Sequence, residues 1–579
     1  MISLKEWPFQ YFELLKDIYN NTGLYLFYDI DTDEIVDEYK YNDSDNYILS
    51  KRYFISGSRN SINSLYRDIN NNITVYSPID YTFNYHKVTE KYSELMNNGN
   101  GLGDDVWLEI ASYTNTKDML KLTLTCSELY KLLLHDRNNM RLHKFTLDRK
   151  MTSLEFLKNL PYKIENLNLN GNSNIDDYSF IYLKNIYSLD ISGCDQISGR
   201  AFEYLEGIHT LVMKHCNGYG FTDKSFENLI GIHTLVISNI GYLRISDKAF
   251  SYLKGIHTLI LTDLRGCKIT GRAFEYLKGI HTLDISGSYL DGIRDKTFEN
   301  LRGIYSLNIS GYLTITDQAF ENFKGIHTLN MSHCKQDKIT DRAFKYLKGI
   351  HTLNMSGCWQ LSITDKAFKY LRNIHTLDIS HTYHTDFAFQ YLKGIHTLYM
   401  SNNSNITDNA FVNLIGINTL DISKCNQKTI TDKAFKYLKG IHTLNIQHCN
   451  QKTITDKAFE YLQGIHTLNM SQCNQKTITN KAFANLHDIY SLNMSECNQF
   501  RITNSAFKYL QNIHTLNMSK CTQITITDKA FWYLRNVHTL NIKGCCQITI
   551  TRIGYNFLKN VPVLYSDCSY GVSYGYKLT

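Results

Sequence analysis

Histidine and cysteine recur at fixed positions through most of the chain, and both side chains can bind metals or take part in catalysis. Twelve histidines occupy the second position of Ile-His-Thr-Leu or of its variant Val-His-Thr-Leu, and Tyr or Asn replaces His in other copies. A metal site needs ligands clustered in a suitable geometry, whereas a residue that recurs in nearly every copy is typical of a structural consensus. No Ser-His-Asp, Walker or Rossmann pattern stands out. We therefore predict no catalytic residue, metal or cofactor.

The regular spacing of these histidines has a physical consequence. Residues that occupy the same position in successive copies of a repeat form a column when the copies stack. Imidazoles in such a column titrate near neutral pH and repel one another once they are charged. The pattern predicts that the repeats lose stability below about pH 6 if the rings lie close together.

Ten of the 14 cysteines share a second repeat position, and no Cys-x-x-Cys pair occurs. Stacked copies could bring such cysteines within disulfide range, but the N-terminus lacks a secretion signal, and an intracellular compartment keeps thiols reduced. We interpret these cysteines as small buried apolar side chains, some donating S–H to the backbone of a turn. They are Cys194, Cys216, Cys334, Cys358, Cys425, Cys449, Cys473, Cys497, Cys521 and Cys545.

The elements that position both columns are internal repeats. The Ile-His-Thr-Leu anchor and its variants define about eighteen units of 21–24 residues. In the unit that begins at Ile441, Leu444 and Ile446 point to one face of a short strand. Thr455 and Asp456 stand where a helix begins, and such residues cap free N–H groups. Gly464 ends the helix, so each unit is predicted as strand, turn, short helix and return.

A unit of this length cannot bury its apolar face alone, but stacked units can. The spacing Leu-x-x-Leu-x-Leu-x-x-Cys followed by Ile-Thr-Asp resembles the leucine-rich repeat, and specifically its cysteine-containing subtype. The resemblance covers about residues 160–568. It implies an α/β solenoid, a horseshoe or superhelix with parallel strands on the concave face and short helices outside. We assign residues 149–568 to the repeats and residues 569–579 to a C-terminal tail.

Residues 101–148 precede the repeats and have apolar residues at helical spacings. The segment resembles an F-box, although Gly103 stands in place of its proline, Thr114 replaces a leucine, and Leu129 or Tyr130 replaces its tryptophan. The alternative is a small helical cap on the open end of the solenoid. The F-box resemblance implies docking on a Skp-family adaptor through Leu102, Val106, Ile110, Leu120, Leu122 and Cys126.

The order of F-box and cysteine-type repeats is a known family architecture. The whole chain resembles the F-box/leucine-rich-repeat proteins encoded by giant DNA viruses of amoebae, in keeping with its bias toward Asn, Ile, Tyr and Lys. This resemblance implies a non-enzymatic substrate receptor of a cullin-RING ubiquitin ligase, located in the host cytoplasm, with the nucleus also possible. The alternative is a protein–protein interaction scaffold in which the F-box-like segment only caps the solenoid.

Residues 1–100 differ from the rest of the chain. They hold 13 of the 42 Tyr, and 15 acidic against 9 basic residues. We expect a small α+β domain that begins with an amphipathic helix over residues 3–20. The basic surplus elsewhere comes from lysines spread along the predicted helices, which indicates a solvated surface rather than a nucleic-acid site. No apolar run approaches the roughly 18 residues of a membrane helix, so neither nucleic acid nor membrane is an expected partner.

The outward-facing strand positions show where a target protein would bind. Most carry Asn or Asp followed by Ser, and such a uniform surface discriminates poorly between partners. Val212, Val236 and Ile260 interrupt this pattern in three successive units, and an exposed apolar stripe often marks a binding site. The target-binding candidates are these three residues together with Lys214 and Tyr399.

Overall fold

The computed structural model describes residues 166–567, apart from 289, 291, 312, 313 and 546, and the backbone of six strands that precede them. Contacts divide the chain into two units. One comprises residues 1–169 and 574–579, and the other residues 170–573. The helix predicted over residues 3–20 and residues 101–144 of the F-box-like segment lie outside the described residues.

Five strands of the first unit form an antiparallel sheet in the order β1-β2-β3-β4-β5. A further short strand pairs in parallel with β7. The strands are β1 (Leu24–Tyr28), β2 (Ile35–Tyr41), β3 (Tyr47–Ile55), β4 (Ile62–Arg67), β5 (Ile73–Val75) and β6 (Phe145–Thr146).

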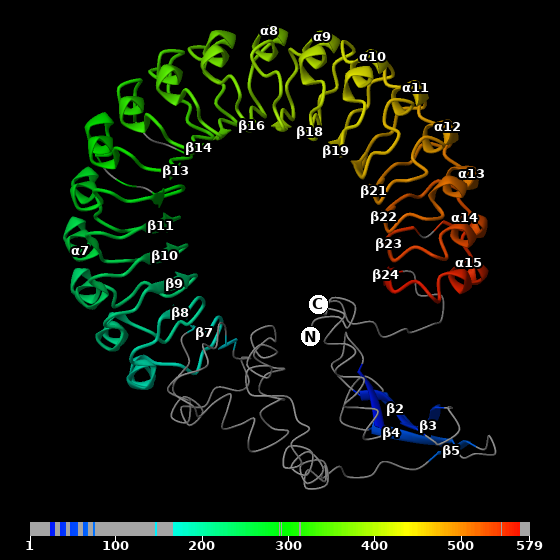
Figure 1. Ribbon diagram of the computed structural model, residues 1–579, viewed down its shortest axis with the longest axis horizontal. Helices are drawn as coiled ribbons and strands as arrows, with labels where there is room; N and C mark the ends of the chain where they lie inside the picture. The colour runs from blue at the N-terminus through cyan, green and yellow to red at the C-terminus, as the bar shows by residue number, and fades with distance from the viewer. Residues whose placement is uncertain are drawn as a thin grey trace. The chain divides into compact units, whose positions relative to one another are not determined.

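Eighteen parallel strands, β7–β24, form an open sheet that lines the inner face of an arc, with the helices outside (Figure 1). The predicted solenoid is thereby confirmed. The strands are β7 (Asn166–Asn168), β8 (Ser188–Asp190), β9 (Thr210–Lys214), β10 (Thr234–Ser238), β11 (Thr258–Thr262), β12 (Thr282–Asp284), β13 (Ser306–Asn308), β14 (Thr328–Asn330), β15 (Thr352–Asn354), β16 (Thr376–Asp378), β17 (Thr397–Tyr399), β18 (Thr419–Asp421), β19 (Thr443–Asn445), β20 (Thr467–Asn469), β21 (Ser491–Asn493), β22 (Thr515–Asn517), β23 (Thr539–Asn541) and β24 (Val563–Tyr565).

The outer face consists of short helical segments, and those of the first half are mainly 3₁₀-helices. A 3₁₀-helix rises about 2.0 Å per residue against 1.5 Å for an α-helix, so it spans the return with fewer residues. The 3₁₀ segments are η2 (Asp177–Leu183), η3 (Gly199–Tyr204), η4 (Asp223–Leu229), η5 (Ser251–Leu253), η6 (Gly271–Tyr276), η7 (Asp295–Leu301), η8 (Ala319–Phe323), η9 (Ala343–Leu347), η10 (Asp365–Tyr370), η11 (Val412–Leu414), η12 (Lys436–Leu438) and η13 (Lys508–Leu510). The α-helices are α7 (Asp247–Phe250), α8 (Asp386–Phe389), α9 (Asp408–Phe411), α10 (Asp432–Phe435), α11 (Asp456–Phe459), α12 (Asn480–Phe483), α13 (Asn504–Phe507), α14 (Asp528–Tyr533) and α15 (Arg552–Phe557).

The core lies between the strands and the helical segments and repeats in every unit. In the unit that begins at Ile441, Leu444, Ile446, Ile454 and Phe459 are all at most 2% exposed. Neighbouring strands pair leucine with leucine, so the apolar columns run without a break from one unit to the next. Burial of each such side chain stabilises the fold by roughly 1.5–3 kcal/mol. Because the apolar side chains of each unit are buried by its neighbours, a single unit would not have this stabilisation on its own.

A hydrogen-bonded fork joins the start of most helical segments to the next unit, the exceptions being η3 and η6, which begin with glycine. The carboxylate of Asp432 accepts two hydrogen bonds of 2.7 Å, one from the N–H and one from the hydroxyl of Thr455. The Thr455 hydroxyl in turn accepts a bond from the N–H of Lys457 at 3.2 Å and so caps its own helix. The capping role predicted for threonine is confirmed. The aspartate beside it has a different role, since it binds the following unit.

Two units replace the aspartate of this fork by asparagine. Asn480 Oδ1 accepts a bond from the N–H of Thr503 at 2.8 Å, and Asn480 Nδ2 donates to the Thr503 hydroxyl at 2.9 Å. Asn504 and Thr527 repeat this arrangement. An amide can therefore fill the position, provided that the threonine hydroxyl accepts instead of donating.

We predict that Asp432→Ala lowers the free energy of unfolding by about 2–3 kcal/mol, because two hydrogen bonds to a charged acceptor are lost. Asp432→Asn should cost less than about 1 kcal/mol, since Asn480 shows that an amide preserves both bonds. Urea denaturation at pH 7 measures both values. Equal losses for the two variants would contradict a role for the fork.

Candidate binding surface

The three aliphatic candidates form a continuous patch on the concave face. Val236 lies opposite Val212 on one neighbouring strand and opposite Ile260 on the other, so we call these residues the aliphatic patch. Val236, in the middle, is 8% exposed, and the two flanking side chains are half-buried. The structure thus brings together three residues that stand 24 positions apart in the sequence.

The other two target-binding candidates lie at different distances from the aliphatic patch. Lys214 ends strand β9 and is exposed, so its ammonium group borders the patch. Tyr399 ends strand β17, pairs with Asp378 and Asp421, and is 39% exposed. Five strands, β12–β16, lie between Ile260 on β11 and Tyr399 on β17, and the two residues therefore belong to different parts of the concave face.

Elsewhere on this face the outward position is polar and internally bonded. Asn445 Nδ2 donates to Asp421 Oδ2 at 2.7 Å, and Asn308 Nδ2 donates to Asp284 Oδ2 at 2.9 Å. The same side chains also bind the turn that follows their strand, as Asp421 Oδ1 does with the N–H of Ser423. A partner that docked here would have to displace these bonds, whereas the aliphatic patch offers apolar surface without that cost.

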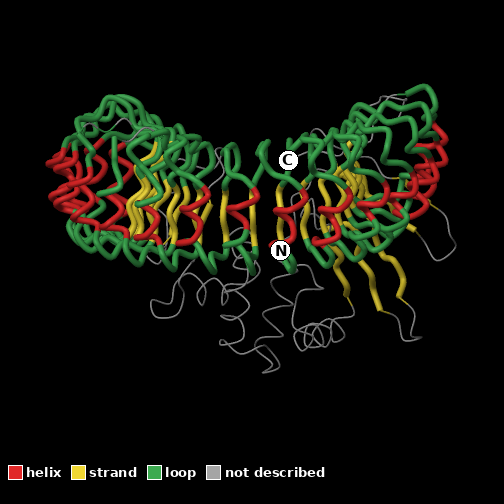
Figure 2. The backbone as a smooth tube through the Cα atoms, turned by 90° about the horizontal axis from the view of Figure 1, so that it is seen from above, coloured by secondary structure: helices red, strands yellow, loops and turns green. Residues whose placement is uncertain are grey.

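The predicted histidine column is present and includes tyrosines. Rings stack from Tyr187 through His396, stop at Asn418, and resume from His442 through His538. Centroids of adjacent rings are 4.3–4.7 Å apart. Desolvation, and then the imidazoles on either side, lower the pKa of His233 and His375. The column lies where the strands begin, on one of the two loop rims that Figure 2 shows.

The cysteine column is buried, as predicted. The thiols donate to the preceding unit rather than to their own turn alone. Cys473 Sγ, for example, lies 3.0 Å from the carbonyl oxygen of Ile446. Burial raises the pKa of Cys334 and Cys358 to about 12. A thiol with such a pKa stays protonated near neutral pH and is a poor nucleophile.

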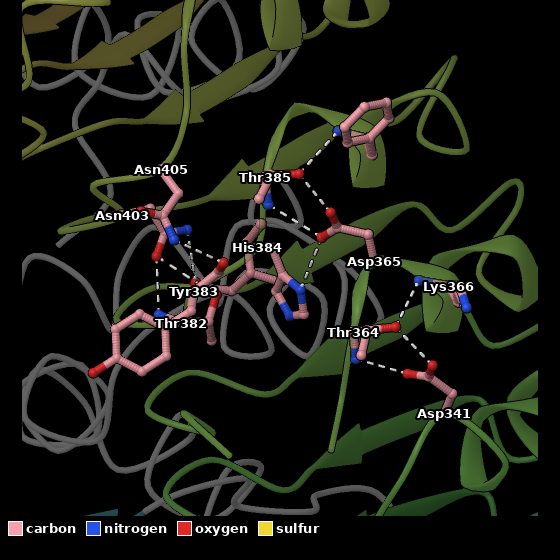
Figure 3. Close-up of polar contacts among 12 residues, drawn as sticks. Asp341, Thr364, Asp365, Lys366, Thr382, Tyr383, His384, Thr385, Asn403 and Asn405 are labelled. Carbon is pink, nitrogen blue, oxygen red and sulfur yellow. Dashed lines mark hydrogen bonds and ion pairs between the residues drawn. The ribbon is translucent and has the colours of Figure 1, made fainter. Parts of the chain in front are cut away.

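The 21-residue unit places a histidine where other units have the core isoleucine. His384 is 4% exposed, and its Nδ1 lies 3.3 Å from Asp365 Oδ1 (Figure 3). The edge of its ring contacts Phe368 at a centroid distance of 4.6 Å. Burial opposes ionisation of Asp365, but hydrogen bonds from His384 and Thr385 outweigh it and lower the pKa of Asp365.

This buried imidazole–carboxylate pair does not form a catalytic triad. A triad needs a hydroxyl hydrogen-bonded to the imidazole, which takes its proton. Here the Thr385 hydroxyl donates to Asp365 Oδ2 at 2.5 Å, so the hydroxyl and the imidazole share one carboxylate. The pair therefore extends the inter-unit fork. Two features of the sequence mark the position of this pair: the 21-residue spacing of the unit and a histidine directly before Thr-Asp.

The same short unit also lacks the cysteine, and Thr382 and Asn403 take over its contacts. Thr382 donates its hydroxyl to the carbonyl of Ile379 at 2.7 Å, and its N–H binds Asn403 Oδ1 at 2.9 Å. Asn403 Nδ2 reaches the same Ile379 carbonyl at 3.0 Å. Figure 3 shows Thr382 and Asn403 side by side. Polar side chains thus satisfy the backbone that a thiol satisfies elsewhere.

The stacked units, with their leucine columns and parallel strands, define a leucine-rich-repeat solenoid. The family model that matches is the BspA-type leucine-rich repeat region, in six copies over residues 137–232, 219–351, 335–442 and 428–564. The chain belongs to this family. Its repeats build a protein–protein interaction scaffold. The match begins at residue 137, so most of the F-box-like segment lies outside it, and no curated protein matches the chain.

Solved structures share the fold at low sequence identity. The TLR13–ssRNA13 complex is 21% identical with a TM-score of 0.52, and the match covers 73% of this chain and 66% of that chain. The mouse RP105/MD-1 complex is 16% identical with a TM-score of 0.46, covering 73% and 84%. The Drosophila Toll–Spatzle complex is 15% identical with a TM-score of 0.46, covering 62% and 50%. The chain therefore spans only part of these structures' own length, namely 66% of the TLR13 chain and 50% of the Toll chain.

The described residues contain neither a cluster of metal ligands nor a membrane-spanning helix. Within them, no three side chains of His, Cys, Asp and Glu gather as ligands for a metal ion. No helix in this part of the chain is long and apolar enough to cross a membrane. The adaptor-binding candidates Leu102, Val106, Ile110, Leu120, Leu122 and Cys126 lie outside the described residues, so their docking role stays a prediction.

The lowered pKa of His233 and His375 sets the sign of a pH effect. Where the folded pKa lies below the unfolded value of about 6.5, the unfolded chain binds more protons, and stability falls as the pH falls through that window. We expect Tm to be constant above pH 7 and to drop between pH 6.5 and 5.5. His351→Tyr/His375→Tyr, which keeps stacked rings at these positions, should reduce the drop. A flat Tm over this range would contradict the prediction.

The buried thiols predict a labelling pattern. N-ethylmaleimide at pH 7.5 should leave Cys449, Cys473 and Cys497 unmodified in the folded protein and modify them in 6 M guanidinium, because the reactive thiolate is suppressed by burial. Half-buried Cys267 should react first among the described cysteines. Peptide mass spectrometry locates the labels. Rapid native labelling of Cys473 would show that the column is accessible.

Proposed function

We propose that this chain is the substrate-recognition subunit of a cullin-RING ubiquitin ligase, in which the solenoid captures a target protein. The observation that carries target capture is the aliphatic patch, three in-register side chains on an otherwise hydrogen-bonded polar face. Apolar anchors in the centre of an interface commonly supply most of its binding energy. Lys214 at the edge of the patch adds a charge for a polar rim.

The link to a ubiquitin ligase rests on the sequence. Residues 101–148 resemble an F-box and immediately precede the repeats, which is the order that a substrate receptor requires. In this proposal Leu102, Val106 and their neighbours dock on a Skp-family adaptor, and the repeats hold the target. Ubiquitin transfer itself belongs to other subunits, and this chain contributes proximity. The second candidate function is a scaffold in which the segment only caps the repeats.

We predict that affinity purification from cell lysate recovers adaptor and cullin with the wild-type chain and that Leu102→Asp/Val106→Asp abolishes this recovery. Apolar contacts at an adaptor interface do not tolerate a buried unpaired charge. Quantitative mass spectrometry measures both proteins. Recovery of a target without any adaptor or cullin would favour the scaffold function. A circular dichroism melt identical to that of the wild type controls for folding.

A second substitution set tests the aliphatic patch. Val212→Asn/Val236→Asn/Ile260→Asn introduces Asn, the commonest residue at this position in the other units, so the fold should persist. Loss of three apolar anchors should weaken target capture at least tenfold, while adaptor recovery stays unchanged. Tyr399→Asn introduces the same residue on a distant strand and should leave capture nearly intact. Unchanged capture by the triple variant would remove the patch from the binding site.

A further inference from the structure

A row of basic side chains borders the histidine column along one rim of the solenoid. Seven successive units carry Lys or Arg three positions before the ring residue, and all seven side chains are exposed. We call this set the basic strip. It consists of Lys254, Lys278, Arg302, Lys324, Lys348, Arg372 and Lys393. The units involved supply strands β11–β17, the green to yellow-green part of the arc in Figure 1.

The basic strip and the ring column end at the same unit. Ile415 stands where the next basic residue would be, and Asn418 stands where the next ring would be. Beyond this point basic residues and rings return, but the basic positions are mixed with Gln463, His487 and Gln511. The basic strip thus runs beside the last seven of the ten rings that stack from Tyr187 through His396.

No ion pair neutralises the strip among the described residues, although Glu275, Glu299 and Glu321 stand three residues before Lys278, Arg302 and Lys324. In each of the seven units the five residues from the basic side chain to the strand's first Thr or Ser include no Asp or Glu. None of the seven basic groups forms an ion pair with a carboxylate in the described part of the chain. Their contacts are with neutral groups. Arg302 Nε binds Asn322 Oδ1 at 3.0 Å, and Lys254 and Arg372 lie over tyrosine rings of the next unit.

The rings present their edges, and not their faces, to a partner. Between His257 and His396 neighbouring rings lie 4.4–4.6 Å apart with interplanar angles of 11–17°. Their faces are therefore occupied by one another. Nδ1 of each histidine lies 3.0–3.2 Å from the hydroxyl of the following Thr, which leaves Nε2 for a partner.

We propose that the basic strip and the ring edges bind an acidic polypeptide segment. Its carboxylates would meet exposed ammonium and guanidinium groups, which are the complementary donors, and a row of Nε2 nitrogens that donate when the imidazoles are protonated. Single-stranded nucleic acid is disfavoured, because its binding proteins stack bases on open aromatic faces, and these faces are covered. The strip is separate from the aliphatic patch, so it is a second surface for a partner of different chemistry.

Fluorescence anisotropy with a labelled poly-glutamate peptide of about 12 residues tests this proposal, since that length spans seven strands spaced about 4.8 Å apart. Lys324→Gln/Lys348→Gln/Arg372→Gln removes three central charges. Gln463 and Gln511 occupy the same position in other units, so the variant should fold. We expect its affinity for the peptide to fall about tenfold at 0.1 M salt, and wild-type binding to weaken as salt rises.

The matched control is Lys433→Gln/Lys457→Gln/Lys481→Gln, which removes three exposed lysines from the first turns of α10, α11 and α12. It changes the net charge equally and should alter the affinity less than twofold. Equal weakening by both variants, or no binding by the wild type, would overturn the proposal. Tighter binding of an oligothymidylate of the same length, lost in the strip variant, would replace it with nucleic-acid binding.

Discussion

The solenoid depends on one constraint: no unit can satisfy its own polar groups or bury its own core. The leucine columns need a neighbouring strand on each side, and the fork from Asp432 to Thr455 joins the cap of one helix to the preceding unit. The cysteine thiol likewise donates to the carbonyl of the unit before it. Three different side chains thus bind across the same inter-unit boundary, which fixes the register in which every surface residue is displayed.

That register explains what the sequence could predict. A leucine-rich solenoid, its strand face and the stacked histidines follow from anchors repeated every 21–24 residues, because side chains at equal positions must form columns. The inter-unit role of the aspartate was not predicted, because a Thr-Asp pair at the start of a helix is typical of a local cap. Its partner lies 23 residues away and is visible only once the units are stacked. The core position of His384 was missed for a related reason, because a three-residue deletion shifts the alignment of its unit.

Function on such a repetitive surface resides in departures from the consensus. Along the concave face, Asn and Asp side chains bind one another and their own turns, and the aliphatic patch at Val212, Val236 and Ile260 interrupts this network. Along the rim, rings stack on one another, and the basic strip supplies charge that no ion pair neutralises among the described residues. The two surfaces differ in chemistry, and a target with an apolar anchor and an acidic segment could engage both.

The central claim is that the solenoid holds its target at the aliphatic patch. Hydroxyl-radical footprinting of the free chain and of the complex purified from lysate tests it most directly, because side-chain oxidation reports solvent access residue by residue. Binding is predicted to protect Val212 and Ile260, while exposed side chains of the outer helices such as Phe387 and Trp532 keep their oxidation rates. Protection confined to the outer helices, with the patch unchanged, would contradict the account.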